Sequence, residues 1–103
     1  MAKRESGFKD FILDQLADLR QVTTHAMFGG HGLYHGAKFF GIIHKDRLSF
    51  KVIPEAVGRY TGKGMKLFQP NAKQTLKSFY EVPIDILEDT EQLVTWAAES
   101  ANR

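Results

Sequence analysis

The sequence contains no cysteine, which excludes disulfide bonds, thiolate metal sites and a cysteine nucleophile. Proline is also scarce, with three in 103 residues, and the chain carries no low-complexity tract or internal repeat. No apolar run approaches the ~20 residues that span a membrane, and none forms a signal sequence behind the charged N-terminus. These absences predict one soluble, cytoplasmic domain over residues 1–103, large enough to fold around a single core.

The charged residues are unevenly distributed, although the net charge is only +2. A basic middle segment, residues 45–77, is followed by an acidic tail, residues 81–103. Two interpretations stay open: a nucleic-acid-binding face beside an acidic shield, or ordinary solvated charges. The candidate nucleic-acid or partner surface comprises the basic residues Lys45, Arg47, Lys51, Arg59, Lys63, Lys66, Lys73 and Lys77.

The first half predicts one helix and an antiparallel meander. Residues 6–21 place apolar side chains at i, i+3 and i+4, which indicates an amphipathic helix with Ser6 as its N-cap. From residue 22 to residue 52 the pattern changes to strands. Gly36-Ala37 and Lys45-Asp46 each separate two strand-like runs by two residues, which predicts tight hairpins, the first of type II′. The run 39–43 is apolar at nearly every position and predicts a central strand, covered on both sides or at a dimer contact.

Residues 29–32 place three glycines among four positions. A phosphate-binding loop is one interpretation, but such loops lie between a strand and a helix, whereas strands flank this segment on both sides. We therefore expect a β-bulge, or a bend where another backbone approaches closely.

The second half predicts a short helix, two strands and a final helix. Pro54 begins a helix that extends to Tyr60. A short strand over 65–68, a turn over 69–72 and a strand over 76–82 follow. Asp89, with Gln92 three residues later, resembles a capping box and predicts that the last helix starts at Thr90. The fold class is therefore α+β, ordered helix, three-strand meander, helix, two strands, helix.

No motif for catalysis or for a cofactor is present. The serines lie in no nucleophile elbow, and the acidic residues 85–89 are explained by helix capping, so we expect no enzymatic activity and no catalytic residue. Four histidines could bind zinc or copper, but the sequence supplies no helical pair or nearby carboxylates to complete a site, so we expect no metal. They are His25, His31, His35 and His44.

Aromatic residues are frequent in the predicted strands and have two interpretations. Exposed among lysines they could stack on unpaired bases, and directed inward they form the core, which we favour. They are Phe39, Phe40, Phe50, Phe68, Phe79 and Tyr80.

Two motifs carry a resemblance to a known family. They are Met27-Phe28-Gly29-Gly30-His31-Gly32-Leu33-Tyr34 and Phe79-Tyr80-Glu81-Val82-Pro83, supported by residues 39–43, 46–48, 51–52, 87–89 and 96–97. Together they resemble the N-terminal domain of the TfoX/Sxy regulators of bacterial competence over nearly the whole chain.

The resemblance implies a two-layer α+β fold and a non-enzymatic role in switching on DNA-uptake genes together with the cyclic-AMP receptor protein. The full regulators of this family carry a further C-terminal helical domain, whereas this sequence ends at Arg103, so the resemblance leaves open a different partner or no competence role at all. We expect a protein-interaction coactivator module, using a sheet edge or the paired sheet faces of a homodimer. The alternative is direct, mainly phosphate-contacting nucleic-acid binding through residues 45–77.

Overall fold

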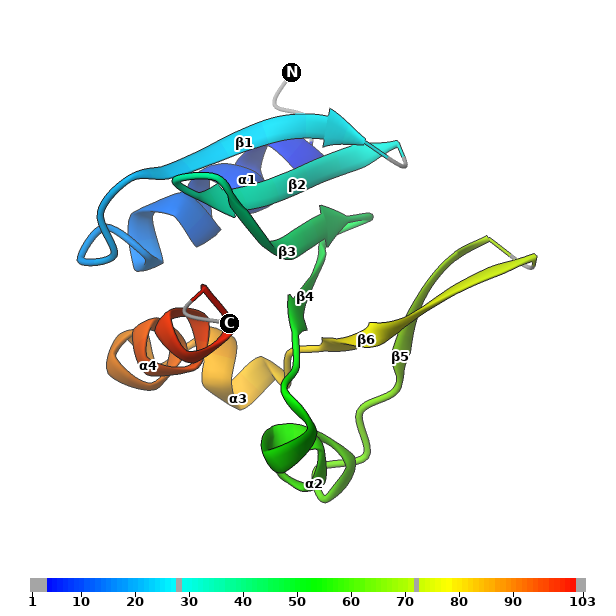
Figure 1. Ribbon diagram of the computed structural model, residues 1–103. Coiled ribbons are helices and arrows are strands. Elements are labelled where there is room, and N and C mark those ends of the chain that lie inside the picture. The colour runs from blue at the N-terminus through cyan, green and yellow to red at the C-terminus, as the bar shows by residue number, and fades with distance from the viewer. Residues whose placement is uncertain (1–3, 28, 72, 102–103) are drawn as a thin grey trace.

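The fold is described by a computed structural model for residues 4–27, 29–71 and 73–101. Helices and strands are mixed along the chain, and all strand pairs in the sheet are antiparallel (Figure 1). The elements are α1 (Arg4–Gln15), β1 (Val22–Met27), β2 (Gly30–His35), β3 (Lys38–His44), β4 (Arg47–Lys51), the 3-10 helix η1 (Pro54–Ala56), α2 (Val57–Thr61), β5 (Leu67–Asn71), β6 (Gln74–Glu81), α3 (Ile84–Leu87) and α4 (Thr90–Ala101).

The six strands form one sheet in the order β1-β2-β3-β4-β6-β5, which confirms the α+β class. The meander has four strands rather than the three expected, because a turn separates β1 from β2, where Met27 pairs with Gly30. Gly29 has a φ of 78°, a left-handed conformation that glycine adopts without steric cost. Phe28 of the motif at residues 27–34, and Ala72 of the predicted turn 69–72, lie outside the described residues.

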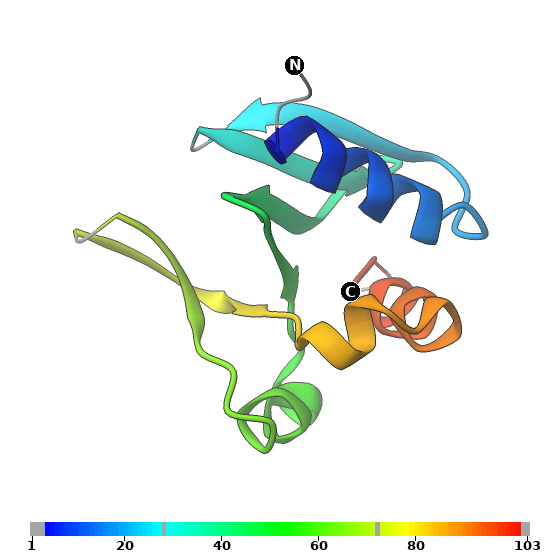
Figure 2. The ribbon, with the colours of Figure 1, turned by 180° about the vertical axis from the view of Figure 1, so that it is seen from behind.

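The structure has two layers. Helix α1 lies over β1 and β2, whereas α4 contacts β3 and β4, on the same side of the sheet (Figures 1 and 2). The sheet bends at β4, and the β5–β6 hairpin extends away from these helices (Figure 2). The opposite surface, which no described helix covers, is called the helix-free face below.

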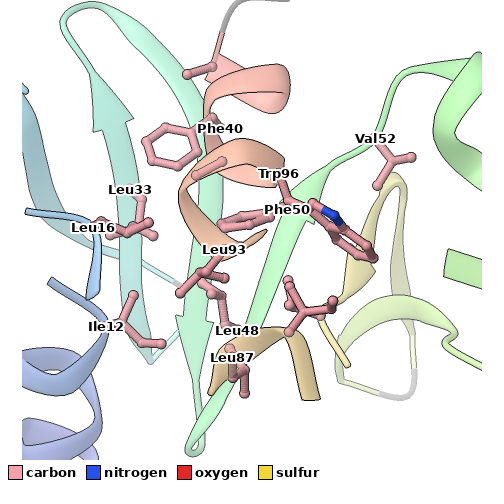
Figure 3. Close-up of a cluster of buried hydrophobic side chains, with 14 of the residues drawn as sticks. Ile12, Leu16, Leu33, Phe40, Leu48, Phe50, Val52, Leu87, Leu93 and Trp96 are labelled. Atoms are coloured by element: carbon pink, nitrogen blue, oxygen red, sulfur yellow. The ribbon is translucent and has the colours of Figure 1, made fainter. Parts of the chain in front are cut away.

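The main core fills the space between the helices and the sheet (Figure 3). Ile12 of α1 and Leu16, which directly follows this helix, meet Leu33, Phe40 and other sheet residues, and all four are at most 1% exposed. The same cluster includes Leu48 and Phe50 of β4, and Leu93, Trp96 and Ala97 of α4.

A β-bulge in β3 explains the uninterrupted apolar run at residues 39–43. Leu33 pairs with Gly41 but its neighbour Tyr34 pairs with Phe39, so Phe40 is the extra residue. The bulge lets Phe40 and Ile43 both join the main core, whereas Phe39 and Ile42 join a second cluster on the helix-free face. The expectation of a strand covered on both sides is confirmed.

Both predicted hairpins are present. His35 pairs with Lys38, and Gly36 alone of the two turn residues has a positive φ, 61°, as a type II′ turn requires. In the second hairpin Lys45 and Asp46 both have positive φ, 51° and 61°, which makes it a type I′ turn built without glycine.

The prediction for the first helix was wrong at both ends. The helix begins at Arg4, so Ser6 lies inside it rather than at its N-cap, and it ends at Gln15 rather than residue 21. Beyond the helix the backbone hydrogen bonds join residues three positions apart instead of four, as where the Leu19 N–H donates to the Leu16 carbonyl. Gln21 then adopts a φ of 66°, which redirects the chain into β1.

The second half agrees with prediction more closely. The helix predicted from Pro54 is formed by η1 and α2, and α4 starts at Thr90 as predicted. Asp89 Oδ1 accepts a hydrogen bond from the Gln92 N–H at 3.1 Å, and Oδ2 accepts one from Gln92 Nε2 at 2.9 Å. These bonds hold the pKa of Asp89 below its ordinary value.

The turn predicted over 69–72 was wrong, because residues 69–71 belong to β5. Strand β5 occupies an edge of the sheet, and an edge strand tolerates Pro70, which has no N–H to donate. The strand predicted over 76–82 is β6 and begins two residues earlier.

Candidate functional site

Part of the predicted basic surface is paired with the acidic tail. Arg47 Nη1 lies 3.2 Å from Glu81 Oε1, and Lys63 Nζ lies 3.0 Å from Asp85 Oδ2. The hydrogen bond from Lys63 lowers the pKa of Asp85 below its ordinary value. The tail therefore supplies counterions to the middle segment rather than a separate shield.

Arg59 is held most firmly of these cations. Its guanidinium donates to both carboxylate oxygens of Glu99, at 2.9 and 3.1 Å, and lies over the Trp96 ring, 5.1 Å from the centroid. A bidentate ion pair combined with a cation–π contact fixes both the position and the orientation of this side chain. Arg59 thus stabilises the packing of α2 against α4 and is poorly placed to meet a phosphate.

The eight predicted cations come from several elements of the fold. Arg47 and Lys51 belong to β4, Arg59 lies on α2, and Lys73 and Lys77 lie in the β5–β6 hairpin. Residues from the same list therefore project from separate parts of the fold (Figure 1).

A groove beside α3 brings two of the ion pairs together around an apolar floor. Its cavity volume is about 590 Å³. Ile84, at its side, is 71% exposed, although it is a large apolar residue. We call this surface the α3 groove; its lining is Asp46, Arg47, Lys63, Met65, Glu81, Val82, Pro83, Ile84, Asp85 and Leu87.

Sequence reasoning missed the α3 groove, because Met65 and the residues after Pro83 meet only in the folded chain. One signal was present. In the segment 84–87 of α3, Ile86 and Leu87 are buried and account for the packing, which leaves Ile84 without a place in the core.

The helix-free face carries a row of aromatic rings. His25 meets Tyr34 edge-on at 4.9 Å between centroids, Tyr34 stacks on Phe39 at 5.2 Å, and Phe39 lies 5.0 Å from Phe79. Beside the row, Ile42, Phe68 and Phe79 form the second buried cluster.

The aromatic residues of the strands serve packing, as favoured from the sequence. Phe40 and Phe50 are fully buried in the main core, and Tyr80 packs against it. Phe68 and Phe79 are less than 10% exposed, so of the predicted set on the helix-free face only Phe39 is half-exposed. The six rings therefore do not form a platform on which several bases could stack.

The histidines are divided between the two faces of the sheet. By the strand register His31 and His35 face the helices, whereas His25 and His44 face the opposite side, where His44 packs edge-on against Phe68 at 5.4 Å. Within residues 4–27, 29–71 and 73–101, no three histidine or carboxylate side chains lie close enough to hold a metal ion.

The glycine-rich segment 29–32 has an architectural role. A Cβ built on Gly30 would lie 2.1 Å from the carbonyl oxygen of Ile43, far inside van der Waals contact. The expected close backbone approach is therefore confirmed at Gly30, and the segment leads from the β1–β2 turn into a strand rather than a helix. The arrangement lacks the helix N-terminus of a phosphate-binding loop.

The helices described in this structure include none that is both long and apolar enough to cross a membrane. A search of curated proteins found no match to the chain. The family model described as TfoX N-terminal domain matches residues 14–103. This match covers most of the chain, from the end of α1 through α4, and the chain therefore belongs to the TfoX N-terminal domain family.

Proposed function

We propose that this domain is a non-enzymatic, cytoplasmic regulatory module that binds a protein partner through the α3 groove. The observation that carries the proposal is Ile84, which is exposed in a groove with an apolar floor that two ion pairs also line. Large apolar residues exposed within a hollow and rimmed by charge are typical of protein interfaces. The partner's side of the interface is therefore an apolar side chain with hydrogen-bonding groups around it.

Membership of the family supports a more specific role. We propose that the module acts as a coactivator in the regulation of competence and DNA-uptake genes, and that the cyclic-AMP receptor protein is its partner. The described residues include no helix-turn-helix unit, because α1, α2 and α4 are each followed or preceded by strands or by the single turn α3, and at least three of the eight candidate cations are already paired. A protein contact is consistent with this distribution of charge.

The test is a titration of the labelled domain with purified cyclic-AMP receptor protein. Ile84→Asp should weaken binding at least tenfold, because it places a carboxylate among apolar groups and the acids of the rim. Phe11→Ser is the matched control, since Phe11 is an exposed large apolar residue on α1 and does not line the groove. Equal loss with both variants, or no binding by the unaltered domain, would contradict the proposal.

The nucleic-acid alternative is tested in parallel. Binding of a generic DNA duplex is titrated at ~50 mM and ~200 mM salt, because phosphate contacts weaken steeply over this range. DNA binding that collapses at the higher salt, and that Lys51→Glu with Lys66→Glu removes, would favour the alternative over the protein contact.

A further inference from the structure

Within the part of the chain that the structure describes, β1 is an edge strand of the sheet, and its sequence lacks the usual protection against pairing. Its residues 22–27 include no charged side chain and no proline. Natural proteins block exposed edges with lysine, proline, bulges or a covering element. The opposite edge, β5, has such a block in Pro70. Strand β1 is therefore the edge at which another strand can be added.

The hydrogen bonds of the hairpin determine which β1 groups point outward. The Gly36 N–H donates to the Gln21 carbonyl at 3.2 Å, in the register that pairs Val22 with His35. In an antiparallel pair only every second residue bonds to a given neighbour. Residues 23, 25 and 27 therefore bond to β2, whereas the N–H and C=O groups of residues 22, 24 and 26 face the free edge.

We propose that a second copy of this chain pairs with the β1 edge, antiparallel, about a two-fold axis at Thr24. Thr24 then lies opposite Thr24 of the second copy, and Val22 lies opposite Ala26 in both directions. Each of these pairs exchanges two hydrogen bonds, so the six outward groups of each copy are satisfied. The two sheets join into one continuous sheet.

The edge is self-complementary, which identifies a second copy as the occupant rather than an unrelated strand. A two-fold axis perpendicular to the sheet keeps each face on its own side. On the helix-free face Thr23 meets His25 of the second copy, and on the other face the two Thr24 side chains meet, a favourable cross-strand pair. No charged residue of β1 meets a like charge, because the strand has none.

The β1 edge lies apart from the α3 groove, whose lining includes no β1 residue. A dimer through β1 therefore leaves the groove of each copy open. The two proposals fail independently: loss of the dimer leaves partner binding unaffected, and loss of partner binding leaves the dimer intact.

The test combines sedimentation equilibrium with amide exchange measured by NMR across a range of protein concentration. We expect a reversible dimer, with the amides of Thr24 and Ala26 becoming protected as it forms. The amides of Thr23 and His25 should be protected at every concentration, because they bond within the hairpin. A chain that stays monomeric at millimolar concentration, or a dimer whose Thr24 and Ala26 amides still exchange freely, would overturn the proposal.

Variants test the orientation of the edge. Thr24→Pro removes an outward N–H at the two-fold axis and should weaken the dimer by roughly tenfold to a hundredfold while leaving the monomer folded. Thr23→Pro is the matched control, since it removes an N–H that bonds within the hairpin and should lower the melting temperature of the monomer. Ala26→Pro repeats the edge test if Thr24→Pro fails to fold. An edge variant that folds and dimerises as tightly as the unaltered chain would contradict the pairing.

Discussion

Gly30→Ala offers the sharpest test of the sheet, because the added methyl meets backbone rather than a movable side chain. Its Cβ would lie 2.1 Å from Ile43 O and 3.1 Å from His44 Cα. Normal contact is at least an ångström longer than the first distance, so β2 and β3 must separate locally and loosen their pairing. Overpacking of this kind costs about 3 kcal/mol, toward the upper end of the usual range. Because Gly30 does not have a positive φ, the cost is steric and not conformational.

Gly32→Ala is the matched control within the same strand. There the Cβ would meet Cε and Sδ of Met27 at 2.7 Å, and these atoms form the flexible end of a half-exposed side chain that can turn aside. It would also lie 3.1 Å from Cε1 of Phe39, a half-exposed ring that needs to shift only slightly. Replacing glycine by alanine also lowers the entropy of the unfolded chain, which offsets ~0.4–1 kcal/mol in both variants. We therefore expect Gly32→Ala to change the free energy of unfolding by less than about 1 kcal/mol.

The assays are urea unfolding and thermal unfolding, each followed by far-UV circular dichroism and tryptophan fluorescence. For a domain of this size, Gly30→Ala should lower the melting temperature by roughly 10–20 °C, and the slope m should stay unchanged. Equal stability of the two alanine variants would refute the close approach between Gly30 and β3. A stabilised Gly30→Ala variant would refute the register of the β1–β2–β3 meander.

Three further predictions concern single residues. Gln21→Gly should stabilise the domain by ~0.5–1 kcal/mol, because glycine accepts the φ of 66° without strain, whereas Gln74→Gly should destabilise it. Tyr60→Phe should leave the free energy of unfolding equal or raise it by ~1 kcal/mol, since the buried Tyr60 hydroxyl interacts with the Ser100 side chain without reaching good hydrogen-bond geometry; a lower free energy of unfolding would show that this bond forms. Asp89→Ala should lower the melting temperature at pH 7. The difference from the unaltered chain should shrink as pH falls below the ordinary pKa of 3.8. The cap lowers the pKa of the Asp89 carboxyl, so the stability that the charged carboxylate gives the folded chain is lost when Asp89 is protonated. Asp89→Asn, which caps without charge, should not show this pH dependence, and a constant difference for Asp89→Ala would contradict the assigned cap.

Local chemistry accounts for the parts of the fold that the sequence predicted well. The two residues Gly36-Ala37 are enough to predict the type of their turn, and the four residues from Asp89 to Gln92 are enough to predict a helix start. The bulge at Phe40 could not be predicted from the sequence. A bulge shows in a sequence as a break in the alternation of apolar and polar residues, and a run that is apolar at nearly every position has no such alternation. The turn at Gly29 was mistaken for a bend within one strand for a related reason: residues 22–27 and 30–35 are both strand-like, and only pairing separates them.

The candidate site depended on contacts that no local pattern contains. The three ion pairs join residues 22 to 40 positions apart, so counting charges along the chain exaggerated the free basic surface. Exposed pairs of this kind contribute little stability, about 0–1 kcal/mol each, and salt weakens them. Their effect on recognition is larger, because a paired cation must release its carboxylate before it can bind a phosphate.

The bulge at Phe40 determines which side chains of β3 enter the main core and which lie on the helix-free face. Without it the alternation of β3 would place Phe40 and Ile42 on one face and leave Phe39, Gly41 and Ile43 on the other. With it, Ile43 joins the main core and Ile42 turns to the helix-free face, where it is buried beside Phe68 and Phe79. Both faces of the central strand are thus filled by this one chain. A second copy paired face to face would find Ile42 already covered, which favours the open β1 edge as the place where two copies meet.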